Sequence, residues 1–185
     1  KRDPLSTMLS AAREFGGLVR FQMAHLTVLL VSEPAYVRHI IGHRKSVIVA
    51  MDWTEFALDV QSTICLYLIT GHGRATPLLW KTVDSRTLKD HRNGYEDEVL
   101  RQLAECLPTE RRVRVVILAD RGFGDVALYS ELEEELGFDY VIRFRKNVLV
   151  EHGNERKTAD QWLAAAGGRS IHLRGPRLTG RSKQV

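Results

Sequence analysis

Apolar and polar positions alternate along the middle of the chain with the periods typical of β-strands and α-helices. Three strands are predicted in succession, over residues 46–52, 61–70 and 75–83. A helix, a strand, a second helix and a fifth strand are predicted to follow, over residues 90–107, 113–119, 125–136 and 138–145. The strands are rich in Val, Ile and Leu, which indicates that they are buried in a sheet.

The two ends of the chain carry weaker patterns. We expect residues 1–44 to be helical, with a short helix over 34–41 that Gly42 ends. Beyond residue 147 we expect short strands at 148–150 and 171–173. Between them, Thr158-Ala-Asp-Gln161 has the spacing of a capping box and predicts the start of a short helix.

The order strand, strand, strand, helix, strand, helix, strand predicts an α/β fold with a mixed sheet. Three antiparallel strands followed by parallel crossover units form the ribonuclease-H-like arrangement. The domain prediction is therefore a helical N-terminal segment over 1–44 and a ribonuclease-H-like core over 45–147. Residues 148–185 are expected to form the start of a strand-rich insertion and an irregular tail.

Two aspartates stand where predicted strands end. Asp52 closes the run that begins at Ser46, and Asp120 follows the run Val113–Ala119. A carboxylate on the end of a rigid strand is suited to a hard divalent cation, which prefers oxygen ligands. In the alternative interpretation, Asp120 caps the helix that follows it and Asp52 starts a loop.

Composition and charge narrow the class of protein. The chain has 185 residues, of which 44% are hydrophobic and 27% charged, and this is typical of a globular protein. A net charge of +4 permits a polyanionic partner. The apolar stretch 18–31 is interrupted by Arg20, Gln22 and His25, so we expect no membrane span and a cytoplasmic protein.

Several motifs together resemble one family. They are Met51-Asp-Trp-Thr54, Ala119-Asp-Arg-Gly-Phe-Gly124 and Phe138-Asp-Tyr-Val-Ile-Arg-Phe-Arg145, with supporting segments at 73–81 and 93–98. Over about residues 44–175 the chain is similar to the catalytic region of bacterial DDE transposases, most of all to the insertion-sequence-four group.

The resemblance implies a DNA transposase that cuts DNA at insertion-sequence ends and joins the 3′-hydroxyl to a target. Asp52 and Asp120 then correspond to the first two acidic residues of the catalytic triad, and both are expected to be catalytic residues and metal ligands. The implied cofactor is Mg²⁺ or Mn²⁺ in a two-metal site. The implied partners are transposon-end DNA, target DNA and a second copy of the chain, in a bacterial, nucleoid-associated setting.

The chain does not match the family at the third acidic residue. The family places it on a later helix, in the pattern Tyr-x2-Arg-x3-Glu-x6-Lys, after a strand-rich insertion. Tyr140 and Arg143 have the first spacing, but Asn147 stands at the Glu position. Since the chain opens with Lys1 and closes in a polar run, we expect a truncated protein. An inactive remnant that binds DNA and another ribonuclease-H-like nuclease stay open as alternatives.

Four basic residues lie near the predicted strand ends. Arg121 follows Asp120, and Arg143, Arg145 and Lys146 end the fifth strand. We predict weak DNA binding here, because cations beside a phosphodiester site add affinity through phosphate contacts. A solvated sheet edge with no ligand is the alternative.

Overall fold

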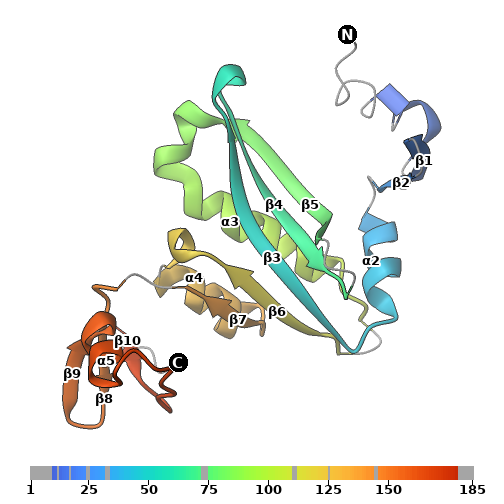
Figure 1. Ribbon diagram of the computed structural model, residues 1–185. Coiled ribbons are helices and arrows are strands. Elements are labelled where there is room, and N and C mark those ends of the chain that lie inside the picture. The colour runs from blue at the N-terminus through green and yellow to red at the C-terminus, as the bar shows by residue number, and fades with distance from the viewer. Residues whose placement is uncertain are drawn as a thin grey trace. The chain divides into compact units, whose positions relative to one another are not determined.

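Figure 1 shows the computed structural model as a ribbon. It divides into two compact units, residues 1–116 and 117–185. The residues that the structure describes are 10–11, 13–16, 18–23, 26–31, 34–71, 75–109, 112–124, 126–143 and 146–178. The domain boundaries predicted at residues 45 and 148 stay predictions.

A five-stranded mixed sheet forms the centre of the fold, in the order β5-β4-β3-β6-β7. Its strands are β3 (Ser46–Phe56), β4 (Gln61–Ile69), β5 (Ala75–Asp84), β6 (Arg114–Ala119) and β7 (Asp139–Ile142). β3, β4 and β5 pair antiparallel, whereas β6 begins beside the start of β3, where the Arg114 N–H donates to the Lys45 carbonyl at 3.0 Å. The α/β expectation is confirmed, and the sheet is compatible with a ribonuclease-H-like domain.

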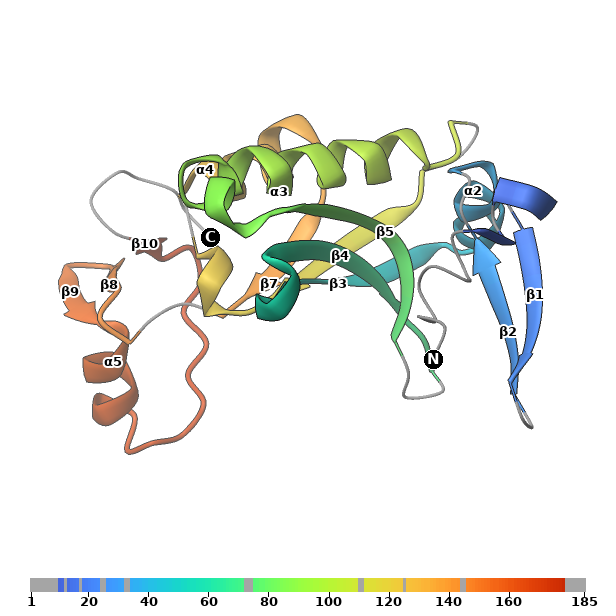
Figure 2. The same ribbon diagram turned by 90° about the horizontal axis from the view of Figure 1, so that it is seen from above.

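Helix α3 (Leu88–Glu105) covers one face of the antiparallel strands (Figure 2). It matches the helix predicted over 90–107. Alternate residues of β3 and β4 are buried together with the inner face of α3. This core consists of Val47, Val49, Met51, Ile64, Leu66, Leu68, Val99, Leu100 and Leu103. The period of two in the strands and the wider helical stripe thus meet in one apolar layer.

The helical expectation for residues 1–44 is wrong over part of its length. Leu18–Met23 (β1) and Leu26–Val31 (β2) form an antiparallel pair of strands. Their sequences alternate Val19 and Phe21 with polar residues or carry Thr27 and Val28, and such β-branched and aromatic residues favour strands. The short helix is confirmed as α2 (Pro34–Gly42).

The second unit contains a short helix and a small sheet. Helix α4 (Val126–Ser130) continues into a π-helical turn over Glu131–Glu135, and β7 follows. Strands β8 (Leu149–His152), β9 (Glu155–Thr158) and β10 (Arg177–Leu178) form a three-stranded sheet in the order β10-β8-β9, beside α5 (Ala159–Ala165). Tyr129, Val150, Trp162 and Leu178 build their common core.

Two predictions about this second unit have opposite outcomes. The capping box is confirmed, because the Gln161 N–H donates to the Thr158 hydroxyl and the Thr158 N–H donates to the Gln161 side chain. The strand predicted over 171–173 is wrong, since those residues are irregular and β10 lies further along. The reason is that Arg177 and Leu178, not 171–173, find partners on β8.

Candidate active site

Asp52 lies inside β3 and not at its end, so the predicted boundary is wrong. The strand continues to Phe56 because Thr54 and Phe56 keep their pairing with Thr63 and Gln61 on β4. The Trp53 side chain reaches Glu96 of α3, and alternation along the strand therefore places the Asp52 side chain on the face that α3 does not cover. Asp52 is exposed there.

The neighbours of Asp52 on that face are a thiol and a phenol of β4. Asp52 is the direct pairing partner of Cys65, and Tyr67 follows two residues later on the same face. Burial raises the pKa of the Cys65 thiol, and the negative charge of Asp52 contributes to the shift. Burial and the same charge help to raise the pKa of Tyr67 to about 12. Both groups are therefore neutral at pH 7.

Trp53, on the opposite face, is bonded to a buried carboxylate of α3 that sequence reasoning missed. Its Nε1–H donates to Glu96 Oε1 at 2.9 Å, and the same oxygen accepts from Arg92 Nε at 3.0 Å. Glu96 is only 3% exposed, and burial raises its pKa. The i,i+4 spacing of Arg92 and Glu96 is the signal that could have indicated a paired acid, although it does not reveal Trp53 as the third member.

Asp120 directly follows β6 and caps the turn after it. Its Oδ1 accepts from the Gly122 N–H at 2.7 Å, at the start of a 3₁₀ turn over Arg121–Phe123. Phe123 is buried and anchors the turn, while Asp120 itself is exposed. Asp120 therefore caps the 3₁₀ turn over Arg121–Phe123 and not the helix α4, which begins at Val126. This cap does not exclude a ligand role, because Oδ2 lies outside the capping bond.

Three of the four predicted basic residues are exposed in the second unit. The Arg143 N–H donates to the Ala119 carbonyl at 3.1 Å, which places the end of β7 beside the residue that precedes Asp120. Arg121 follows Asp120, and Lys146 forms an ion pair with Asp160 at 3.5 Å. Arg145 lies outside the described residues. The prediction of DNA contact by these residues stays a prediction.

The donor chemistry of the two aspartates fits a hard cation, although they do not form a full ligand set. Among the described residues, no group of three or more His, Cys, Asp or Glu side chains could hold a metal ion. Carboxylate oxygens are nevertheless the ligands that Mg²⁺ and Mn²⁺ prefer.

The described helices include none that is long and apolar enough to cross a membrane.

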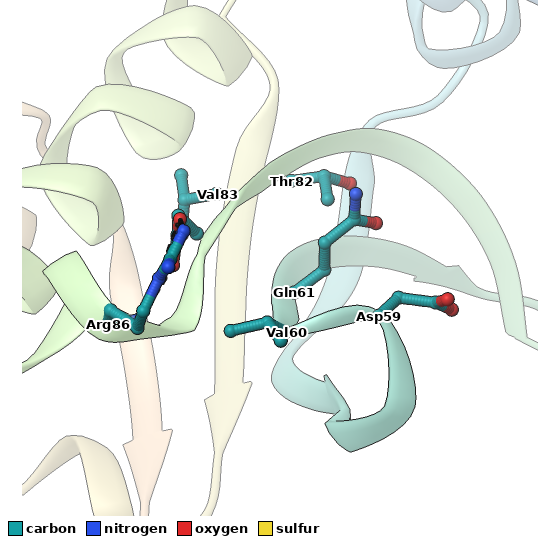
Figure 3. Close-up of a pocket in the computed structure, with 7 residues that line it drawn as sticks. Asp59, Val60, Gln61, Thr82, Val83 and Arg86 are labelled. Carbon is teal, nitrogen blue, oxygen red and sulfur yellow. Dashed lines mark hydrogen bonds and ion pairs between the residues drawn. The ribbon is translucent and has the colours of Figure 1, made fainter.

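Two cavities lined by described residues contain neither aspartate in their lining. One, of about 350 Å³, lies where β4 and β5 approach the turn at Ala57–Asp59. Figure 3 shows the Asp59 carboxylate pointing away from Arg86. The Arg86 guanidinium is bound to Asp84, whose pKa this hydrogen bonding lowers to about 2. Neither Asp52 nor Asp120 lines this cavity.

Comparison with known proteins gives one match. The model of a family described as "Transposase DDE domain" matches residues 85–184. The matched segment contains Asp120, Arg121, Arg143 and Lys146 and begins after Asp52. No curated protein and no solved structure gives a significant match.

Proposed function

The chain belongs to the transposase DDE domain family, and on this premise we propose that it acts on DNA by metal-dependent phosphodiester cleavage and strand transfer. The proposed substrates are the ends of an insertion sequence of the insertion-sequence-four type and a target DNA. The observation that carries the proposal is the turn at Asp120, which lies inside the family match. It presents an exposed, fixed carboxylate beside Arg121 and Arg143.

We assign Asp52 and Asp120 as the metal-binding carboxylates. β3 and β6 are neighbours in the sheet order, and both side chains are exposed. A bound divalent cation would lower the pKa of an attacking water or 3′-hydroxyl and stabilise charge on the leaving oxygen. Asp120 holds its carboxylate in one rotamer through the Gly122 N–H, which leaves Oδ2 as the oxygen for a metal. The neutral Cys65 and Tyr67 add no competing charge beside Asp52.

The basic residues are assigned to the DNA phosphates. Arg121 and Arg143 are exposed beside the Asp120 turn, Lys146 is exposed further along the chain, and Arg145 is included from the sequence alone. Contacts of this kind attract DNA without reading its sequence and weaken as salt rises. From the family resemblance we also propose that the chain acts as a homodimer on paired transposon ends.

A Mn²⁺ titration of stability tests the metal assignment. Metal that binds only the folded protein should raise the free energy of unfolding by about 1.4 kcal/mol when its concentration is ten times Kd. We expect this gain to disappear in Asp52→Asn and in Asp120→Asn. Asp59→Asn is the matched control, because Asp59 is an exposed carboxylate of the turn after β3.

The same variants decide whether the carboxylates support DNA cleavage. We expect Mn²⁺-dependent nicking of supercoiled plasmid DNA by the parent and by Asp59→Asn, and its loss in both site variants. Stabilisation by Mn²⁺ that persists in Asp52→Asn and Asp120→Asn would contradict the assignment. Nicking that persists in both would show that the catalytic groups lie elsewhere.

A further inference from the structure

Strand β3 is buried at alternate positions up to Met51, and beyond Met51 the Trp53 side chain forms a hydrogen bond with α3. Met51, 2% exposed, is the last buried residue of the strand, and Thr54, Glu55 and Phe56 are exposed. Between them, the Trp53 indole reaches α3 and donates its N–H to Glu96. Of the described side-chain hydrogen bonds between β3 and α3, this one lies closest to Asp52.

The Glu96 carboxylate is held in place by two hydrogen-bond donors. It is 3% exposed and accepts from both Trp53 and Arg92, whose guanidinium also lies 5.5 Å from the centroid of the Trp53 ring. A buried carboxylate is costly unless its partners hold it, and apolar residues of similar volume often give equal stability. Fixing a neighbouring group in one geometry is a role that an apolar residue could not fill.

That neighbouring group is Asp52. Consecutive side chains of a strand leave opposite faces, so the orientation of Trp53 and the peptide that joins the two residues set the direction of the Asp52 side chain. We propose that Glu96 is a positioning residue, which holds Trp53 against α3 and thereby aims the Asp52 carboxylate. The consequence of this positioning for metal binding rests on the proposed function, whereas the effect of Glu96 on strand β3 does not.

Two variants remove the bond from either side. Trp53→Phe keeps an aromatic ring and loses the donor, and Glu96→Leu keeps the size and loses the acceptor. Glu96→Gln keeps an oxygen that can accept from Trp53 and should restore the parent behaviour in part. Glu98→Gln is the matched control, because Glu98 lies on the same helix but pairs with Lys81 of β5.

The first readout is amide hydrogen exchange measured residue by residue by NMR. Loss of a hydrogen bond to a charged group is expected to speed exchange about tenfold in residues 52–54 and in their β4 partners 63–65. The effect should appear in Trp53→Phe and Glu96→Leu, decrease in Glu96→Gln and be absent in Glu98→Gln. Unchanged exchange in this segment, or equal acceleration in the Glu98 control, would overturn the inference.

The second readout is Mn²⁺ affinity, measured by water-proton relaxation at a temperature where every variant is folded. We expect affinity to fall about three- to tenfold in the first two variants and to stay unchanged in Glu98→Gln. Faster local exchange with unchanged affinity would overturn the aiming role. If the parent does not bind Mn²⁺ at all, the proposed function fails, and the exchange data still decide whether Glu96 fixes the strand.

Discussion

Substitution of Asp120 by Asn and by Ala separates its capping role from its charge. Asn keeps a side-chain oxygen that can accept from the Gly122 N–H, and Asn and Asp are about equally good N-caps. Ala removes the acceptor. Without metal, we therefore expect Asp120→Ala to be less stable than Asp120→Asn, which should be at least as stable as the parent.

The magnitude follows from the geometry of the cap. Replacing an N-cap by Ala costs about 0.5–2 kcal/mol in helices. The capping bond is short, at 2.7 Å, but Asp120 is exposed and the turn is only three residues long. Buried Phe123 also anchors the turn independently. We therefore expect a loss of about 1 kcal/mol, which changes the ratio of folded to unfolded protein about fivefold.

Urea unfolding in the presence of a chelator measures these differences. A lower midpoint with an unchanged m-value would show that stability alone has changed. Equal stability of Asp120→Ala and Asp120→Asn would refute the contribution of the cap. A gain in Asp120→Asn over the parent would show that Asp120 is repelled by another carboxylate, as clustered ligands without a metal are. If Asp120→Asn loses as much stability as Asp120→Ala, the stabilisation comes from the charge of Asp120 and not from the capping bond.

Three further predictions concern stability. Thr158→Ala should cost about 0.5–2 kcal/mol because it removes one half of the capping box of α5, and hydrogen exchange in 159–165 should report it, with Gln161→Ala giving a comparable loss. Trp162→Phe should destabilise the second unit more than Leu163→Ala in urea unfolding, since Trp162 is 8% exposed and donates to the Val150 carbonyl at 3.1 Å, while Leu163 is 43% exposed. Burial raises the pKa of Glu96 and so favours its protonated form in the folded state. The resulting contribution to stability is present below the unfolded pKa of about 4.3 and is lost as pH rises through the folded pKa. Glu96→Gln should therefore gain stability relative to the parent as pH rises over this interval.

The parts of the fold that the sequence predicts are those set by local periodicity. The α3 prediction over 90–107 agrees with Leu88–Glu105, because an 18-residue helix with one buried stripe repeats its signal over several turns. The capping box is equally local, since both partners lie within four residues. These features depend little on distant parts of the chain, and pattern alone is sufficient for them.

The features that the sequence does not predict depend on pairing with other segments of the chain. β3 extends past Asp52 because β4 offers pairing partners as far as Gln61, and the two residues of β10 are a strand only because β8 lies beside them. In the sequence, Glu96 is one of several polar residues of a predicted helix. Its burial depends on Trp53, which lies 43 residues earlier in the chain. The assignment of Asp52 and Asp120 as metal ligands, which came from strand ends and family resemblance, stays a prediction.

The two candidate carboxylates are held in physically different ways, and this affects how their variants are interpreted. Asp120 is fixed by its own side chain, through the Gly122 N–H, so Asn preserves the local structure and removes mainly the charge. Asp52 is fixed by the β-ladder with Cys65 and, through Trp53, by Glu96 on the far face. Because its carboxylate is not the group that holds the strand, Asp52→Asn should also leave the backbone unchanged. Loss of metal-dependent behaviour in either Asn variant can therefore be assigned to the missing charge and not to a disrupted fold.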